Sequence, residues 1–169
     1  MLHVLKRRNA RKANAERLCR ATSERARAPV FYAEFGVADS LDGRFDLVVL
    51  HAWLVLDAIV AAGDAALAQC LVDVLFVQFD EALRELGVGD MGMSRRMKNM
   101  AEAFNGRVAA YRSAARDETL AGAILRNVYR GTPGRLESAA QLANYCNKAR
   151  AHLAQSHPEK GDADFGALP

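Results

Sequence analysis

Proline is absent from residue 30 to residue 132, and this gap constrains the fold more than any other feature of the sequence. The four prolines are Pro29, Pro133, Pro158 and Pro169. A proline inside a helix removes a hydrogen bond and clashes with the preceding turn, so a proline-free stretch leaves long helices unbroken. Alanine and leucine, which favour helix, are abundant here, and no run alternates apolar and polar residues as a half-buried strand does. The sequence therefore predicts an all-α protein, a single-domain bundle of about six to seven helices.

Glycine, proline and capping residues place the expected helix ends. Asp42 and Asp64 are expected to cap two helices, because a short acidic side chain accepts hydrogen bonds from free N–H groups of the first turn. Gly63 and Gly87 are expected to end helices. The expected helices span residues 9–27, a short segment after Pro29, and residues 44–62, 65–86, 94–116, 118–129 and 136–154, with loops at 36–43 and 87–92.

Residues 47–60 form the most apolar stretch, but His51 and Asp57 interrupt it. A membrane-spanning helix needs about 20 mostly apolar residues, so we expect this stretch to be the central buried helix of the bundle. His51 is expected to be a core histidine whose ring nitrogens are hydrogen-bonded, and the alternative is an axial haem ligand or a catalytic base.

Motifs for catalysis, metals and phosphates are missing from the sequence. There is no HExxH zinc motif, no GxSxG nucleophile elbow and no GxxxxGK[ST] phosphate loop. Asp39, Asp42 and Asp46 lack the ligand spacing of an EF-hand, so we expect them to be loop acceptors and caps. We predict no enzymatic activity, no cofactor and no bound metal.

Positive charge is concentrated at the start of the chain. Residues 1–28 hold nine basic and two acidic side chains, a net charge of +7, whereas the whole chain carries +3, which leaves −4 for the remainder. A basic segment on an acidic body is typical of proteins that bind a polyanion: RNA, a ribosome surface or an anionic membrane. The alternative is a solvated helix face. The residues expected to mediate adhesion are Lys6, Arg7, Arg8, Arg11 and Lys12. We expect three parts: a basic N-terminal arm or helix (1–28), a helical domain (29–156) and a flexible C-terminal tail (157–169).

Four of the five methionines fall within residues 91–100. One interpretation is ordinary core filling. The other is an adaptable apolar surface beside Arg95, Arg96 and Lys98, because flexible thioether side chains adjust to apolar partners of variable shape.

Three blocks of sequence, in order and at matching spacing, resemble the ubiquinol–cytochrome c chaperone family. The first runs from Phe35-Gly36-Val37-Ala38-Asp39 through Ser40-Leu41-Asp42-Gly43-Arg44-Phe45 to Leu50-His51-Ala52-Trp53. The second comprises Leu86-Gly87-Val88-Gly89-Asp90-Met91, Arg95-Arg96-Met97-Lys98 and Met100-Ala101-Glu102-Ala103-Phe104-Asn105-Gly106-Arg107; the third is Arg126-Asn127-Val128-Tyr129. Asn105 departs from the pattern, since the family commonly has an aromatic residue there. The resemblance is to a bacterial member.

The resemblance implies a non-enzymatic assembly factor that binds newly made cytochrome b and promotes assembly of the ubiquinol–cytochrome c reductase complex, respiratory complex III. Mitochondrial members also bind the ribosome near its tunnel exit and use a small partner protein; whether this chain has such a partner does not follow. The competing hypothesis is an RNA- or ribosome-binding module that acts through the basic arm. No DNA partner is expected. The expected location is the cytoplasm, as a peripheral protein on the cytoplasmic face of the inner membrane.

The client surface is expected where residues 39–45, the loop at 87–93 and the start of the following helix come together. The expected client-binding residues are Asp39, Asp42, Arg44, Met91, Met93, Met97, Arg95, Arg96 and Lys98. The methionines would contact apolar client helices, and the cations would meet polar loops or lipid phosphates. A surface site of this kind requires at least two of Met91, Met93 and Met97 to remain exposed.

Overall fold

The computed structural model describes residues 2–116 and 119–169, with side chains except at 2–5, 90 and 91. Within this part of the chain there are seven α-helices, one 3-10 turn and no strand, so the predicted all-α class is confirmed. The helices are α1 (Leu2–Ala26), α2 (Val30–Ala33), α3 (Leu41–Ala61), α4 (Ala65–Glu85), α5 (Asp90–Arg116), α6 (Leu120–Asn127) and α7 (Leu136–Leu153), followed by the 3-10 turn η1 (Pro158–Lys160).

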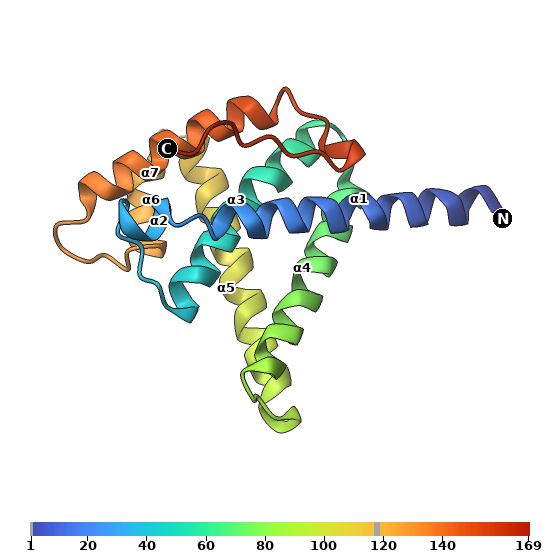
Figure 1. Cartoon of the computed structure of the whole chain (residues 1–169), viewed down its shortest axis with the longest axis horizontal. Helices are drawn as coiled ribbons and strands as arrows, with labels where there is room; N and C mark the ends of the chain where they lie inside the picture. Colours follow the sequence, from blue (N-terminus) through green and yellow to red (C-terminus); the bar gives the residue numbers. More distant parts are fainter. Residues whose placement is uncertain (1, 117–118) are drawn as a thin grey trace.

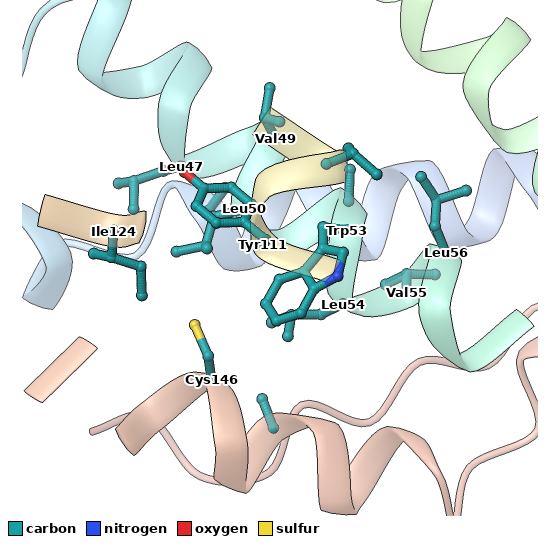
Figure 2. Packing of buried hydrophobic residues seen from close by; sticks show 14 of the residues in the cluster. Leu47, Val49, Leu50, Trp53, Leu54, Val55, Leu56, Tyr111, Ile124 and Cys146 are labelled. Carbon is teal, nitrogen blue, oxygen red and sulfur yellow. The ribbon is translucent and has the colours of Figure 1, made fainter. Parts of the chain in front are cut away.

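Helix α3 is the centre of the bundle, as its apolar sequence predicted. It packs against α1, α4, α5 and α7 (Figure 1), and twelve of its residues are buried. Figure 2 shows side chains of α3 together with Tyr111 of α5, Ile124 of α6 and Cys146 of α7, which meet in one core. The Trp53 and Tyr111 rings lie 5.5 Å apart, so the largest buried side chains connect α3 to α5.

His51 is a fully buried core residue with both ring nitrogens hydrogen-bonded, which confirms the predicted role. Its Nδ1 lies 2.8 Å from the carbonyl oxygen of Leu47, and its Nε2 lies 2.9 Å from the Tyr145 hydroxyl. A carbonyl oxygen only accepts, so Nδ1–H donates to Leu47 and the hydroxyl of Tyr145 donates to Nε2. The Nε–H of Arg25 in turn donates to the Tyr145 hydroxyl. Burial lowers the pKa of His51 to about 4.

Helix α3 begins three residues earlier than predicted, and its N-cap is Ser40, so the predicted cap at Asp42 is wrong. The Ser40 hydroxyl accepts a hydrogen bond from the backbone N–H of Gly43, with an N–O distance of 3.1 Å. Residue 43 has to be glycine, because a Cβ atom there would collide with the carbonyl oxygen of Ala38. The Asp64 cap of α4 is confirmed: its carboxylate accepts from the backbone N–H of Leu67 at 2.9 Å.

Helix α5 begins at Asp90 rather than at residue 94, so the second half of the predicted glycine-rich loop, residues 90–92, is the first turn of a helix. Gly87 ends the preceding helix with a positive φ of 80°, as predicted. The connection between α4 and α5 is therefore short, and the two helices form a hairpin whose turn lies at an extremity of the molecule (Figure 1).

Helix α1 is part of the bundle from its middle onward, so residues 1–28 are not a separate arm over their whole length. Its buried residues face α3 and α4 and are Ala15, Leu18, Cys19, Thr22 and Ala26. The N-terminal turns of α1 extend past the rest of the molecule (Figure 1). The basic arm is thus the projecting N-terminal part of a core helix.

The expected flexible tail at 157–169 is packed against the body. Pro158 and Phe165 are buried, and Phe165 belongs to the main core. The side chains of Asn14, Arg17 and Arg25 on α1 donate hydrogen bonds to backbone carbonyls of this segment. An isolated phenylalanine within a polar segment gave no periodic signal from which this packing could be predicted.

Candidate functional site

The hairpin of α4 and α5 carries the methionine-rich segment on a face that continues the core. Met93, Met97, Met100 and Phe104 recur at spacings of three and four residues, so they share one face of α5. Met93 is only 5% exposed, which excludes it as a surface contact in this conformation. Met97 and Met100 are half-buried, and the side chain of Met91 lies outside the described residues. Met93 is therefore wrong as an exposed contact, and the requirement that two of Met91, Met93 and Met97 be exposed now depends on Met91 and half-buried Met97.

Apolar surface at the hairpin turn is contributed by leucine as well as methionine. Leu86, which follows the last residue of α4, is 61% exposed, whereas Leu83 is buried. Helical spacing places both in one apolar stripe of α4, made up of Leu67, Leu71, Leu75, Phe79, Leu83 and Leu86. The stripe loses its cover toward the turn because the hairpin extends beyond the helices that pack against its base, as Figure 1 shows.

The cations predicted beside the methionines are at the surface. Arg95, Arg96 and Lys98 are exposed, and Lys98 Nζ lies 3.9 Å from Glu102 Oε1, an exposed pair of small energetic value. The start of α5 thus combines a half-buried apolar face with exposed positive charge.

Phenylalanine rings connect the start of α3 to the middle of the hairpin. Phe45 lies 5.5 Å from Phe79, Phe79 lies 5.5 Å from Phe76, and Phe76 lies 5.5 Å from Phe104. Seven residues separate Phe79 from Leu86, about 10 Å along a helix. The expected meeting of residues 39–45 with the loop at 87–93 is therefore wrong in detail: the start of α3 packs about two turns from the hairpin turn.

The acidic residues at the start of α3 act locally rather than as an open binding loop. Arg44 Nε lies 2.7 Å from Asp39 Oδ1, and both side chains are exposed; this contact lowers the pKa of Asp39. Asp42 Oδ2 lies 3.3 Å from Arg130 Nη2, across the surface. These pairs stabilise the turn that leads into α3, so nothing in their geometry sets Asp39, Asp42 and Arg44 apart as client contacts.

Asp46, expected from the sequence to be a loop acceptor or a cap, is instead a buried carboxylate within α3. It is 0% exposed and lies 2.9 Å from Arg107 Nη2 and 3.0 Å from Arg130 Nη2. Burial raises the pKa of Asp46 to about 6, and the two arginines oppose that rise. Arg130 adopts a left-handed backbone with φ of 54°, a conformation that costs about 1 kcal/mol for a non-glycine residue. The network ties α3, α5 and the loop after α6 together.

Five of the basic residues of α1 lie in its first three turns. Lys6, Arg7, Arg8 and Lys12 are exposed, and Arg11 Nε lies 3.8 Å from the Asp64 carboxylate at the start of α4. Arg8, Arg11 and Ala15 are spaced by three and four residues, so the cationic side chains continue the helix face that is buried further along. This face of α1 is therefore apolar within the bundle and positively charged in the turns that project from the bundle.

The described residues hold no group of three or more histidine, cysteine or acidic side chains that could bind a metal ion. None of the helices in the described ranges is both long enough and apolar enough to span a membrane.

The family is shown by comparison with known proteins. Residues 33–160 match the model of the ubiquinol–cytochrome C chaperone family. The chain belongs to this family.

A solved structure of high similarity is described as the Cbp3 homolog from Brucella abortus. It is 35% identical, with a TM-score of 0.81 over 99% of this chain and 97% of that one. Comparison with curated proteins gives no match.

Proposed function

We propose that this chain is a non-enzymatic chaperone that promotes assembly of the ubiquinol–cytochrome c reductase complex by binding newly made cytochrome b. Family membership supports the assembly role. The observation that supports a client-binding surface on the α4–α5 hairpin is the apolar stripe of these two helices. It continues from the core to half-buried Met97 and Met100 and to exposed Leu86, beyond the cover of the other helices.

Cytochrome b helices are apolar, and a client of this kind needs a surface without fixed shape. Thioether side chains adapt to irregular apolar partners, and exposed Arg95, Arg96 and Lys98 supply positive charge for polar client loops or lipid phosphates. Met93 is left out of the proposed contacts because it is buried, and Met91 stays a prediction from the sequence.

Two exposed leucines provide a test with a matched control. Leu86→Ser removes apolar surface at the hairpin turn, and Leu136→Ser does the same at the start of α7, where the leucine is 63% exposed. Because both side chains are largely in solvent, each variant should fold nearly as stably as the wild type, within about 0.5 kcal/mol. Cytochrome b should co-purify in reduced amount with the Leu86 variant and in normal amount with the Leu136 variant.

Charge at the same site is tested by Arg96→Glu, with Arg20→Glu on α1 as the matched exposed control. Reversal at Arg96 should impair cytochrome b capture, and reversal at Arg20 should not. Normal capture by both the Leu86 and the Arg96 variants would remove the hairpin turn as the client surface.

The alternative function, an RNA- or ribosome-binding module, is favoured by the projecting cationic turns of α1. We propose that these turns add adhesion to a ribosome or an anionic membrane while the hairpin binds the client. The protein would then act as a peripheral protein at the cytoplasmic face of the membrane.

A further inference from the structure

The C-terminal segment lies in a groove between α1 and α7. After α7 ends, the chain turns back through η1 and runs alongside α1 in the same direction, as the red trace in Figure 1 shows. Asn14 and Arg17 contact residues 159 and 160, and Arg25 contacts residues 165–167, so the contacts advance together along both segments.

The groove binds this segment largely through its backbone. Arg25 Nη2 donates to the carbonyl oxygens of Phe165, Gly166 and Ala167, at 3.4, 2.9 and 2.7 Å. Asn14 Nδ2 donates to the carbonyl oxygen of Glu159 at 2.7 Å. Carbonyl oxygens are present in every polypeptide, so side chains that donate to them accept many sequences.

One side chain of the segment serves as an anchor. Phe165 is 6% exposed, its ring centroid lies 5.7 Å from that of His51, and the Arg25 guanidinium lies 5.7 Å from its centroid. Gly166 follows with φ of 72°, and a Cβ atom at this position would collide with the His152 ring. The site therefore combines backbone recognition with a pocket for one aromatic ring.

The groove is larger than its occupant. An open pocket of about 470 Å³ lies beside the end of the segment, lined by Phe35, Tyr145, Lys148 and Leu168 among others. Space beside the end of the segment would admit a side chain bulkier than that of Ala167, which contributes to the lining of this pocket.

We propose that the groove between α1 and α7 is a binding site for an extended polypeptide with an aromatic anchor, and that residues 157–169 are its displaceable, autoinhibitory occupant. The partner is an unfolded segment of a client chain, a choice that rests on the proposed chaperone function. The segment's own binding mode defines the ligand: an extended backbone, one aromatic side chain and a small residue after it. This site is separate from the hairpin turn.

The test uses the full chain and a fluorescently labelled synthetic peptide with the sequence of residues 157–169. Phe165→Ala removes the resident anchor, so this variant should bind the peptide at least tenfold more tightly than the wild-type chain does. A matched peptide with alanine in place of phenylalanine should bind the variant at least tenfold more weakly than the wild-type peptide. Fluorescence anisotropy measures both, and circular dichroism checks folding.

Equal binding of the two peptides, or equal binding to the two chains, would overturn the proposal and leave the segment as a fixed part of the core. If Phe165→Ala does not fold, Phe165→Leu, which keeps an apolar side chain in the pocket, decides by the same comparison with a threefold threshold. The assay contains no cytochrome b, so its failure leaves the hairpin test of the proposed function unaffected.

Discussion

At the scale of single residues, the start of α3 depends on one hydroxyl group and one missing Cβ atom. The Ser40 side chain satisfies the backbone N–H of Gly43, and the absent side chain of Gly43 admits the carbonyl oxygen of Ala38. The more acidic neighbour, Asp42, lies within the first turn, where its charge interacts favourably with the helix dipole without capping a backbone group.

Ser40→Ala is expected to lower the free energy of unfolding by about 1 kcal/mol, because the backbone N–H of Gly43 loses its hydrogen-bond acceptor. Asp42→Ala is the matched control and should cost less than about 0.5 kcal/mol, since it removes only a surface charge and a surface ion pair. Urea denaturation measures both. A larger loss for Asp42→Ala than for Ser40→Ala would contradict the assignment of the cap.

The sequence could not distinguish these two caps. Asp39, Ser40 and Asp42 are all good N-cap residues, and the choice among them depends on where the first turn is held by the chain that packs against Gly43. The Asp64 cap of α4 was predictable because one candidate stands there alone, directly after Gly63.

His51 should make stability depend on pH in the acidic range. Its folded pKa of about 4 lies below the ordinary value of 6.5, so the unfolded chain binds a proton that the folded chain does not, and stability falls as the pH drops from 6.5 to 4. The loss attributable to His51 should reach about 3 kcal/mol. His51→Gln can still bond Leu47 and Tyr145 but does not titrate. The difference between wild type and this variant, measured by urea denaturation at several pH values, should follow that slope; parallel curves would exclude a buried neutral histidine.

At the scale of elements, α1 serves two roles along its length. Its second half supplies Leu18 and Cys19 to the core, and its first turns project with basic side chains. A count of charges over residues 1–28 reveals the second role and conceals the first, because alanine and cysteine contribute little to an apolar pattern. The helix predicted at residues 9–27 is present within α1. Charge alone could not show where the projecting turns end and the part packed in the bundle begins.

Leu18→Ala is therefore expected to destabilise the whole protein by about 2–4 kcal/mol, because it leaves a cavity between α1, α3 and α4. Leu86→Ala, at a leucine that is 61% exposed, is the control and should change stability by less than about 0.5 kcal/mol. Thermal or urea unfolding gives both values. An unfolding free energy that is unchanged in the Leu18 variant would show that α1 is dispensable to the core, and deletion of residues 1–28 would then leave a folded body.

The hairpin shows the same limit of sequence patterns. Helical spacing identified the apolar stripes of α4 and α5, and tertiary structure decides which parts of them are covered. Met93 and Leu86 stand near the same turn, yet one is buried and the other exposed. The buried network joins Asp46 to Arg107 and Arg130. Asp46 and Arg130 are 84 positions apart in the chain, and a single sequence gives no signal that two residues so far apart are paired.

At the scale of the whole molecule, the two candidate surfaces lie apart. The cationic turns of α1 and the hairpin turn of α4 and α5 are separate extremities in Figure 1. They also differ in physical character, since one offers charge on a polar helix and the other an apolar stripe beside cations. Separate location and separate chemistry predict that adhesion and client capture can be lost one at a time.

Replacing Arg7 and Arg8 together with alanine is expected to weaken binding to ribosomes or to vesicles that contain anionic lipid, and to leave cytochrome b capture unchanged. Each basic residue near an anionic surface contributes about 1 kcal/mol, so the affinity should fall by about tenfold or more at low salt. The difference should shrink as salt rises, because exposed charges are screened. Arg11 is left intact because it lies beside Asp64.

The matched control replaces Arg20 and Arg27, two exposed arginines nearer the body, and removes the same net charge. Co-sedimentation at two salt concentrations measures adhesion, and co-purification measures client capture. If the control pair weakens adhesion as much as Arg7 and Arg8 do, net charge rather than the projecting turns attracts the partner. If either pair abolishes client capture as well, the two surfaces act as one, because a polyanion held at α1 would then be needed to bring the client to the hairpin.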